Sequence, residues 1–522
     1  MRLTGLFLGA SMLAIALPAS AQTAPRSAVP ATVPVQTGPV TTLRDALVTA
    51  YNTSPELAGE RANLRATDEN VPIARSQGLP GINATAGYSE NVYDSAAGAV
   101  QQQIGPNRQV TGGVNLSVPI YSGGSVRNNI RAADTRVEAG RANLRSAEAQ
   151  LFTDVVASYL DVMRDEAVVR LNQQNVHVLE VNLQATRDRF EVGDLTRTDV
   201  AQSEARLALA QSQLQTAEAQ LISSREGYIR VVGVAPGTLS QPPSLPNMPG
   251  DSASAVRVAL DENPALQAAH KVSDAAAFDV KAARAGRLPQ VAVQVGNNYY
   301  NYLGSVGNPA LYGPNDGFST TAGVQLSMPL FQGGLPAARI RQAQARQSQA
   351  IEQATQTERG VIAQARSAFT VWQSAQRVIE SSKVAVEANR LSLEGVRAEN
   401  SVGTRTILDI LNAEQELLNS QVQYVTAKRD AYVAGFALLA AMGKAEAEDL
   451  ALEGGPQLYD PTVNYHRVRN NINDWASDPA PQPQGTRTYL SPIQTPEVGP
   501  DPGNDPVLQR PVDTDTPNPS GN

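Results

Sequence analysis

The sequence predicts a mixed α and β membrane protein made of two similar halves. Three patterns predict this fold: one long passage occurs twice, short segments alternate between apolar and polar residues, and long segments carry heptad repeats. The passage Leu116–Gly124 returns as Leu326–Gly334, so Pro119 has its counterpart 210 positions later at Pro329. A repeat this long exceeds the period of a solenoid, and each copy should therefore be half of a duplicated architecture.

Composition and the duplication divide the chain into seven segments. Both ends are rich in proline and poor in large apolar residues, so they should not form a packed core. The expected segments are a signal peptide at 1–21, a disordered N-terminal spacer at 22–40, a first structural repeat at 41–235, a linker at 236–250, a second structural repeat at 251–445, a periplasmic C-terminal region at 446–478 and a disordered proline-rich tail at 479–522.

The first 21 residues predict export from the cytoplasm. Arg2 precedes an apolar run, and Ala19-Ser20-Ala21 has the small-x-small pattern that signal peptidase cuts. The chain contains no cysteine. A lipid on an N-terminal cysteine, disulfides and thiolate chemistry are therefore excluded.

Charge and hydropathy exclude two further classes of protein. A net charge of −8, a pI near 5.2 and the lack of a long basic run argue against nucleic-acid binding. After the signal, no segment approaches the roughly 18 consecutive apolar residues that an α-helical membrane span needs. Any membrane-crossing segment should therefore be a β-strand, and a mean hydropathy of −0.26 agrees with short alternating strands.

Each half begins with a helical pattern that ends at a Leu-Pro pair. The first pattern starts at Leu43 and stops at Leu79-Pro80, and the second stops at Leu288-Pro289. Because proline breaks a helix interior, each pair marks the point where the chain leaves the helix.

Period-2 alternation follows each Leu-Pro pair and predicts two strand hairpins. The alternating apolar positions are Ile82, Ala84, Ala86 and Tyr88, then Val110, Val114, Leu116 and Val118, and in the second half Val291, Val293 and Val295, then Phe318, Ala322, Val324, Leu326 and Met328. Small and polar residues fill the other face, as in a wall between lipid and a watery lumen. The alternative is a half-buried soluble sheet. Aromatic residues gather at bilayer interfaces and so favour the membrane interpretation; those near the loop ends are Tyr88, Tyr93, Tyr299, Tyr300, Tyr302 and Tyr312.

Long helices with heptad repeats follow the strands. From Gly124 a helix is expected to about Phe190, roughly 100 Å at 1.5 Å per residue. After a turn at Val192–Leu195, large residues recur at every seventh position and form one seam of a coiled coil. They are Val200, Leu207, Leu214, Leu221 and Tyr228, with Ile410, Leu417, Tyr424, Ala431 and Leu438 in the second half. Small residues lie between them, which predicts close-packed antiparallel coiled-coil hairpins. A soluble coiled coil is the alternative.

The number of strands limits how the protein can assemble. One chain supplies four candidate strands, whereas membrane barrels need at least eight because an open edge in lipid leaves backbone groups unpaired. The chain should therefore oligomerise. Two chains would give eight strands and a filled interior, and three would give twelve and leave room for a passage.

The sequence resembles the TolC family of outer membrane efflux and secretion channels from Leu43 to Gly443. The residues that carry the resemblance are Val118–Gly124 with its copy and, above all, Val402–Glu414 at the second hairpin turn. The resemblance implies a homotrimer in the outer membrane of a Gram-negative cell, with a twelve-stranded barrel in lipid and a periplasmic barrel of twelve helices. It also implies no cofactor, no catalysis, and two partners: a periplasmic adaptor (membrane fusion) protein and an inner membrane ABC or proton-driven pump.

Carried over by position, the resemblance implies a gate at the periplasmic tip. Thr198 and Asp199 of the first hairpin and Arg405 of the second fall on positions that link hairpins. Asp409 falls on a ring of acidic residues that narrows the lumen. The alternative for Thr198 and Asp199 is capping of the helix that follows the first turn.

Two residues depart from the family's pattern at this gate. Asn400 stands where the family has a linking tyrosine, and Asn412 stands where it has the aspartate of a second ring. Closure should therefore be looser, and the constriction should carry one acidic ring.

Two other functional classes are compatible with parts of the sequence. An enzyme is not favoured, because His177, His270 and His466 lack metal-ligand spacing and no glycine-rich phosphate loop follows a strand. A structural or adhesive coiled-coil surface trimer would share the signal, heptads and strands, but such proteins usually carry the barrel at one end of the chain.

Within transport, type I protein secretion is favoured over small-molecule efflux. The match at Val402–Glu414 is to secretion-type members, the lipidated cysteine of many drug-efflux members is absent, and the second turn region has no insertion. Small-molecule or multidrug efflux remains the alternative.

Overall fold

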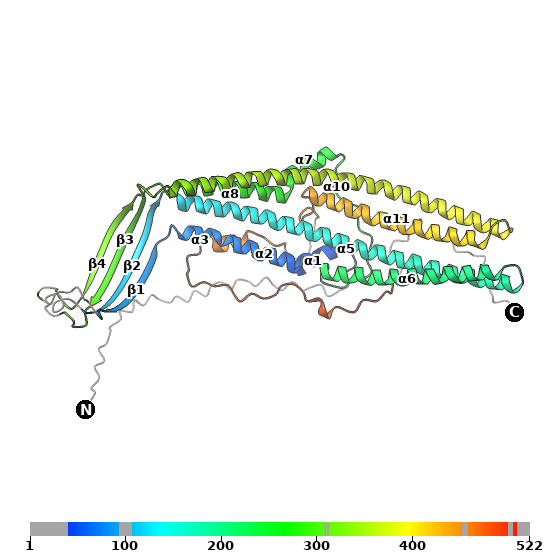
Figure 1. Ribbon diagram of the computed structural model, residues 1–522, viewed down its shortest axis with the longest axis horizontal. Coiled ribbons are helices and arrows are strands. Elements are labelled where there is room, and N and C mark those ends of the chain that lie inside the picture. The colour runs from blue at the N-terminus through cyan, green and yellow to red at the C-terminus, as the bar shows by residue number, and fades with distance from the viewer. Residues whose placement is uncertain are drawn as a thin grey trace, which may run out of the picture. The chain divides into compact units, whose positions relative to one another are not determined.

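The computed structural model describes residues 40–92, 107–306, 310, 313–450, 458–499 and 505–508. These belong to one compact unit, residues 39–522, and the expected signal peptide lies outside them. The elements (Figure 1) are, in order, α1 (Leu43–Thr53), α2 (Pro55–Asp68), α3 (Asn70–Ser76), β1 (Gly81–Glu90), β2 (Arg108–Ser122), α5 (Ser125–Glu191), α6 (Arg197–Val232), α7 (Ser252–Glu262), α8 (Pro264–Ala285), β3 (Gln290–Asn301), β4 (Asp316–Ser327), α10 (Leu335–Ser401), α11 (Ile407–Ala441), α12 (Val463–Val468) and a 3₁₀ turn, η1 (Thr488–Leu490).

The two predicted strand hairpins join into one antiparallel sheet with the order β1-β2-β3-β4. β2 pairs with β3, so Leu116 of the first half lies opposite Val295 of the second. Apolar side chains of the sheet stay exposed in the single chain, with Ile82 at 71% and Phe318 at 76%. Within the described residues β1 and β4 each have one free edge, so closing this sheet requires strands from another chain.

Aromatic residues lie toward the loop ends of the sheet. Tyr299 of β3 lies opposite Phe318 of β4 with ring centroids 5.0 Å apart, and Tyr300 packs against Tyr302. Tyr93 and Tyr312, which the sequence analysis groups with them, lie outside the described residues.

Two long helices, α5 and α10, follow the two hairpins and have 67 residues each. The prediction of a helix from Gly124 to about Phe190 is confirmed by α5, which ends at Glu191. Both helices begin after a glycine in the left-handed region, Gly124 at φ 82° and Gly334 at φ 86°, where a side chain would be strained. No helix in the described ranges has an apolar stretch long enough to cross a membrane.

The shorter helices α6 and α11 fold back along α5 and α10 as antiparallel partners (Figure 1). The predicted heptad seam of α11 is confirmed, because Ile410, Leu417, Tyr424 and Leu438 are all buried. In α6 the small seam residues Ser203, Ala210 and Ala217 are buried. Small residues at every second seam position let the helix backbones approach closely.

Part of the proline-rich tail, 479–522, is described, at 479–499 and 505–508. Arg225 of α6 donates to the carbonyl oxygen of Glu497 at 3.0 Å, and Lys428 of α11 pairs with Asp505 at 2.9 Å. These described residues therefore lie against helices of both halves. Composition alone does not reveal this, because backbone carbonyls of a proline-rich segment accept hydrogen bonds without any apolar periodicity.

Candidate functional site

The two hairpin turns, where the sequence analysis places a gate, have the same local structure. α5 turns into α6 at 192–196, and α10 turns into α11 at 402–406. Gly193 and Gly403 adopt φ of 82° and 81°, so each turn depends on a glycine at the same position of its repeat. The duplicated sequence thus presents two equivalent tips.

A capping box starts the second helix of each hairpin. In α6 the Asp199 amide donates to Thr196 Oγ1 at 3.3 Å, and Asp199 Oδ2 accepts from the Thr196 amide at 2.9 Å. In α11 Thr406 and Asp409 make the same two bonds, at 3.4 and 3.0 Å. The cap residue of α6 is therefore Thr196, and Thr198 stays exposed on the first turn.

These capping bonds also set the charge of the two aspartates. Hydrogen bonds from the backbone N–H and hydroxyl of Thr406, with a smaller effect of Arg405, lower the pKa of Asp409. The hydroxyl and backbone N–H of Thr196 lower the pKa of Asp199 in the same way. Both carboxylates are therefore negative throughout the physiological range, as an acidic ring requires.

Arg405 and Asn400 come together inside the second turn. Arg405 Nε pairs with Glu399 Oε2 at 2.7 Å, and Asn400 Nδ2 donates to the Arg405 carbonyl oxygen at 2.7 Å. Within the described chain the partner of Arg405 is thus a carboxylate of its own hairpin, and Asp199 is engaged in its capping box. Glu399 is a functional candidate that the positional comparison did not include.

The link between the two hairpins near their tips is made by Arg206 and Asn412. Arg206 Nη2 of α6 donates to Asn412 Oδ1 of α11 at 2.6 Å. Beside this bond, Leu179, Ala210 and Leu411 form a buried apolar cluster that joins α5, α6 and α11. Asn412 therefore joins the second hairpin to the first, and its partner Arg206 is not among the residues predicted from the sequence.

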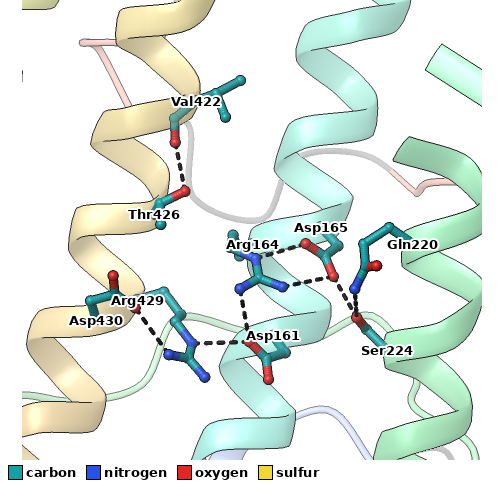
Figure 2. A network of polar contacts seen from close by, with 9 residues as sticks. All are labelled: Asp161, Arg164, Asp165, Gln220, Ser224, Val422, Thr426, Arg429 and Asp430. Atoms are coloured by element: carbon teal, nitrogen blue, oxygen red, sulfur yellow. Dashed lines mark hydrogen bonds and ion pairs between the residues drawn. The ribbon is translucent and has the colours of Figure 1, made fainter. Parts of the chain in front are cut away.

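A second polar link between the hairpins lies farther from the tips (Figure 2). Arg429 Nε of α11 lies 2.9 Å from Asp161 Oδ1 of α5, and Arg164 contacts the same carboxylate at 3.1 Å. Arg164 also pairs with Asp165 at 2.7 Å, and Asp165 accepts a hydrogen bond from Ser224 of α6. This network ties α11 to α5 and α5 to α6, so it holds both hairpins as one unit.

The described residues contain no group of three or more His, Asp or Glu side chains that could hold a metal ion. The site consists of helix ends, exposed carboxylates and links between hairpins. Such an arrangement can open or close by relative movement of the hairpins.

Comparison with known proteins identifies relatives over most of the chain. Residues 46–234 and 255–444 match the model of a family described as outer membrane efflux protein. The outer membrane efflux protein BepC of Brucella suis biovar 1 is 31% identical over 82% of this chain and 91% of its own length. The alkaline protease secretion protein AprF of Pseudomonas aeruginosa is 28% identical over 59% of this chain and 64% of its own.

Solved structures show the same fold. The outer membrane protein VceC of Vibrio cholerae superimposes with a TM-score of 0.66 at 22% identity, and the match covers 77% of this chain and 96% of that one. The matched ranges of the family model fall one in each half, in agreement with the duplicated architecture.

Proposed function

Because the chain belongs to the outer membrane efflux protein family, the TolC family, we propose that it is the exit duct through which one tripartite export system releases its cargo. Channels of this family lie in the outer membrane of Gram-negative bacteria with a large periplasmic helical barrel, and they are passive channels rather than enzymes. They work with a periplasmic adaptor and an inner membrane pump. The resemblance drawn from Val402–Glu414 is therefore confirmed.

The observation that carries the proposal is the pairing of an open sheet with two equivalent helical hairpins. Four strands with free edges at β1 and β4 do not close, and homotrimers are typical of the family. Three copies would supply twelve strands, which leave room for a passage. They would also supply twelve hairpin helices for the periplasmic barrel, namely α5, α6, α10 and α11 from each chain.

We place the gate of this duct at the hairpin tips. Asp409 would contribute one carboxylate from each chain to a ring, and Asn412 would hold the second hairpin against the first through Arg206. The same periplasmic tip would be lined by Thr198, Asp199, Asn400 and Arg405. Their position on or beside the two equivalent turns supports this. Movement of the second hairpin away from Arg206 would open the passage.

Polypeptide cargo, delivered by a type I secretion pump, is the first candidate. The secretion-type turn at Val402–Glu414 supports it, and the protease secretion protein AprF is among the relatives. Small-molecule efflux is the second candidate, since BepC, which matches over 91% of its own length, is named an efflux protein.

Two experiments test the function and the cargo. Single-channel recording in planar bilayers should show discrete conductance steps, whereas an adhesive surface trimer would show none. Affinity capture of the native protein should then co-purify an adaptor together with an ABC transporter. Recovery of a proton-driven pump in its place would support small-molecule efflux.

A further inference from the structure

Both halves form a groove where the last short helix meets the start of the long helix. In the first half this groove lies between α3 and α5, and the chain fills it with its own C-terminal region. Tyr465 of α12 packs on the cluster around Val71 and Ala133, and its hydroxyl donates to Asp134 at 2.8 Å. Arg75 donates to the carbonyl oxygen of Arg469 at 3.3 Å.

The equivalent groove of the second half lies between α8 and α10 and is open. It forms a pocket of about 560 Å³, whose lining residues are Arg284, Arg287, Leu288, Ala337, Ile340, Arg341 and Gln344. The repeat makes Arg284 the counterpart of Arg75. The C-terminal region contacts the first groove, and among the described residues no segment fills the second in the same way.

Three guanidinium groups give this pocket its charge. Arg287 stands where the first half has Gly78, so the second groove carries a cation that the first lacks. Among the described residues no ion pair or side-chain hydrogen bond involves Arg284, Arg287 or Arg341. Arginine presents a planar fork that matches phosphate oxygens, and three arginines beside the apolar side chains of Leu288 and Ile340 favour an oxyanion as the ligand.

The pocket lies next to the ends of the strands. Arg287 is three residues before β3, and Arg341 is six residues into α10, about 9 Å from the helix start. Leu330 and Phe331, between β4 and α10, are 89% and 90% exposed. Arginines close along the chain to exposed apolar residues are typical of the level where lipid headgroups meet acyl chains.

We infer that this pocket binds the phosphate of an anionic phospholipid in the periplasmic leaflet, one lipid for each chain. The three guanidinium groups hold the phosphate, and the acyl chains run along Leu330 and Phe331. Such a lipid fills the groove of the second half. In the first half, α12 and the residues after it fill the equivalent groove. It also fixes the junction between the sheet and the long helices at the membrane surface.

Native mass spectrometry of the detergent-solubilised protein tests this site. Phosphatidylglycerol is titrated against diacylglycerol with the same acyl chains and against inorganic phosphate. The test variant is R284Q/R287Q/R341Q, and the matched control R339Q/R346Q/R359Q removes three exposed charges of α10 that do not line the pocket. R287G, which installs the residue of the first half, is a milder second variant.

Wild type and control should retain one phosphatidylglycerol per chain, and the triple test variant should bind it at least about tenfold more weakly. R287G should give a smaller loss in the same direction, and diacylglycerol should not bind. Equal retention by the test variants would overturn the proposal. So would full competition by inorganic phosphate at equal concentration, since the site would then serve a free anion. Dissociation of the oligomer in the test variants alone would show that the pocket is a contact between chains.

Discussion

Arg206 of α6 and Asn412 of α11 lie 2.6 Å apart and connect the two coiled-coil hairpins close to their tips. The bond joins a cation to a neutral amide at a position where the family has an aspartate. An amide oxygen is a weaker partner for a guanidinium than a carboxylate is. Close to their tips, the hairpins of this chain are therefore held together by an apolar cluster and a bond of moderate strength.

Strengthening this link should close the duct further. N412D turns the contact into an ion pair and should lower the open-to-closed ratio by up to about fivefold, whereas R206Q should raise it by a similar factor. Single-channel open probability in planar bilayers measures both effects. The double variant R206Q/N412D separates the ion pair from the added ring charge, because it keeps the charge of Asp at 412 and removes the cation at 206. An unchanged open probability in N412D and R206Q would show that this contact does not restrain the tip.

The partner of Arg405 determines whether this arginine links two hairpins or stabilises only its own turn. Since Arg405 pairs with Glu399 in its own turn, R405S and E399Q should raise conductance and leak by the same amount, and the double variant should add nothing. The effects of R405S and E399Q are thus coupled, and D199N should not change this coupling. A coupling between R405S and D199N, with none to E399Q, would instead support a link from hairpin to hairpin in the assembled duct.

Asp409 should act as a cation-binding ring beyond its capping role. D409A should weaken block by trivalent cations and reduce cation preference, because three carboxylates at a constriction attract multivalent cations. D199A is the matched control, since it removes the equivalent capping carboxylate of the first hairpin. Trivalent cations should block D199A as strongly as they block the wild type. Block that weakens equally in both variants would mean that only capping was lost.

The pH dependence of that block follows from the pKa of Asp409. Its hydrogen bonds from Thr406 lower this pKa below the ordinary 3.8. In a single chain the carboxylate therefore stays charged as the pH falls to about 4. If these bonds outweigh the repulsion among the three carboxylates of the ring, block should persist at that pH and disappear only in stronger acid. Titration of blocker affinity from pH 7 to pH 3 measures this. Loss of block near pH 6 in wild type, with D409A blocked as strongly as wild type at pH 7, would assign the block to another group.

The architecture was predictable from the sequence because it depends on periodic patterns. The duplicated passage, the alternating strands and the seam through Leu417 each extend over many positions, so single exceptions do not hide them. The capping boxes also leave a local signal, Thr at the cap and Asp three residues later, as at Thr406 and Asp409. Local sequence signals therefore predict where the helix after each turn begins.

The contacts of the candidate site were less predictable because they join residues far apart in the chain. Arg206 and Asn412 are 206 positions apart, and no periodicity distinguishes Arg206 from the other arginines of α6. Glu399 lies near Arg405 in sequence, yet which carboxylate an arginine selects depends on the path of the turn. The groove filled by Tyr465 in one half and open in the other likewise follows from a segment outside the repeat.

Glu148 of α5 should make stability depend on pH near neutrality. Burial raises its pKa from 4.5 to about 7, although its carboxylate accepts a 2.7 Å hydrogen bond from the Ala447 amide. The unfolded chain releases this proton at lower pH than the folded chain does. Stability should therefore fall as the pH rises from about 4.5 to about 7, by at most about 3 kcal/mol, and level off above.

The unfolding temperature of the solubilised protein between pH 4.5 and 8 measures this effect. E148Q keeps an acceptor for the Ala447 amide without a charge, so its unfolding temperature should fall less over this window. E180Q, an exposed site on the same helix, should follow the wild type. A wild-type slope in E148Q would assign the pH dependence to other groups.

The assembly of three chains into one duct is tested most directly by counting the chains in the membrane-inserted complex. Native mass spectrometry of the protein released from lipid nanodiscs gives this number. Four strands with free edges at β1 and β4 predict a complex of three chains, with no smaller species that remains inserted. A single chain that is stable in the bilayer would contradict the trimeric duct.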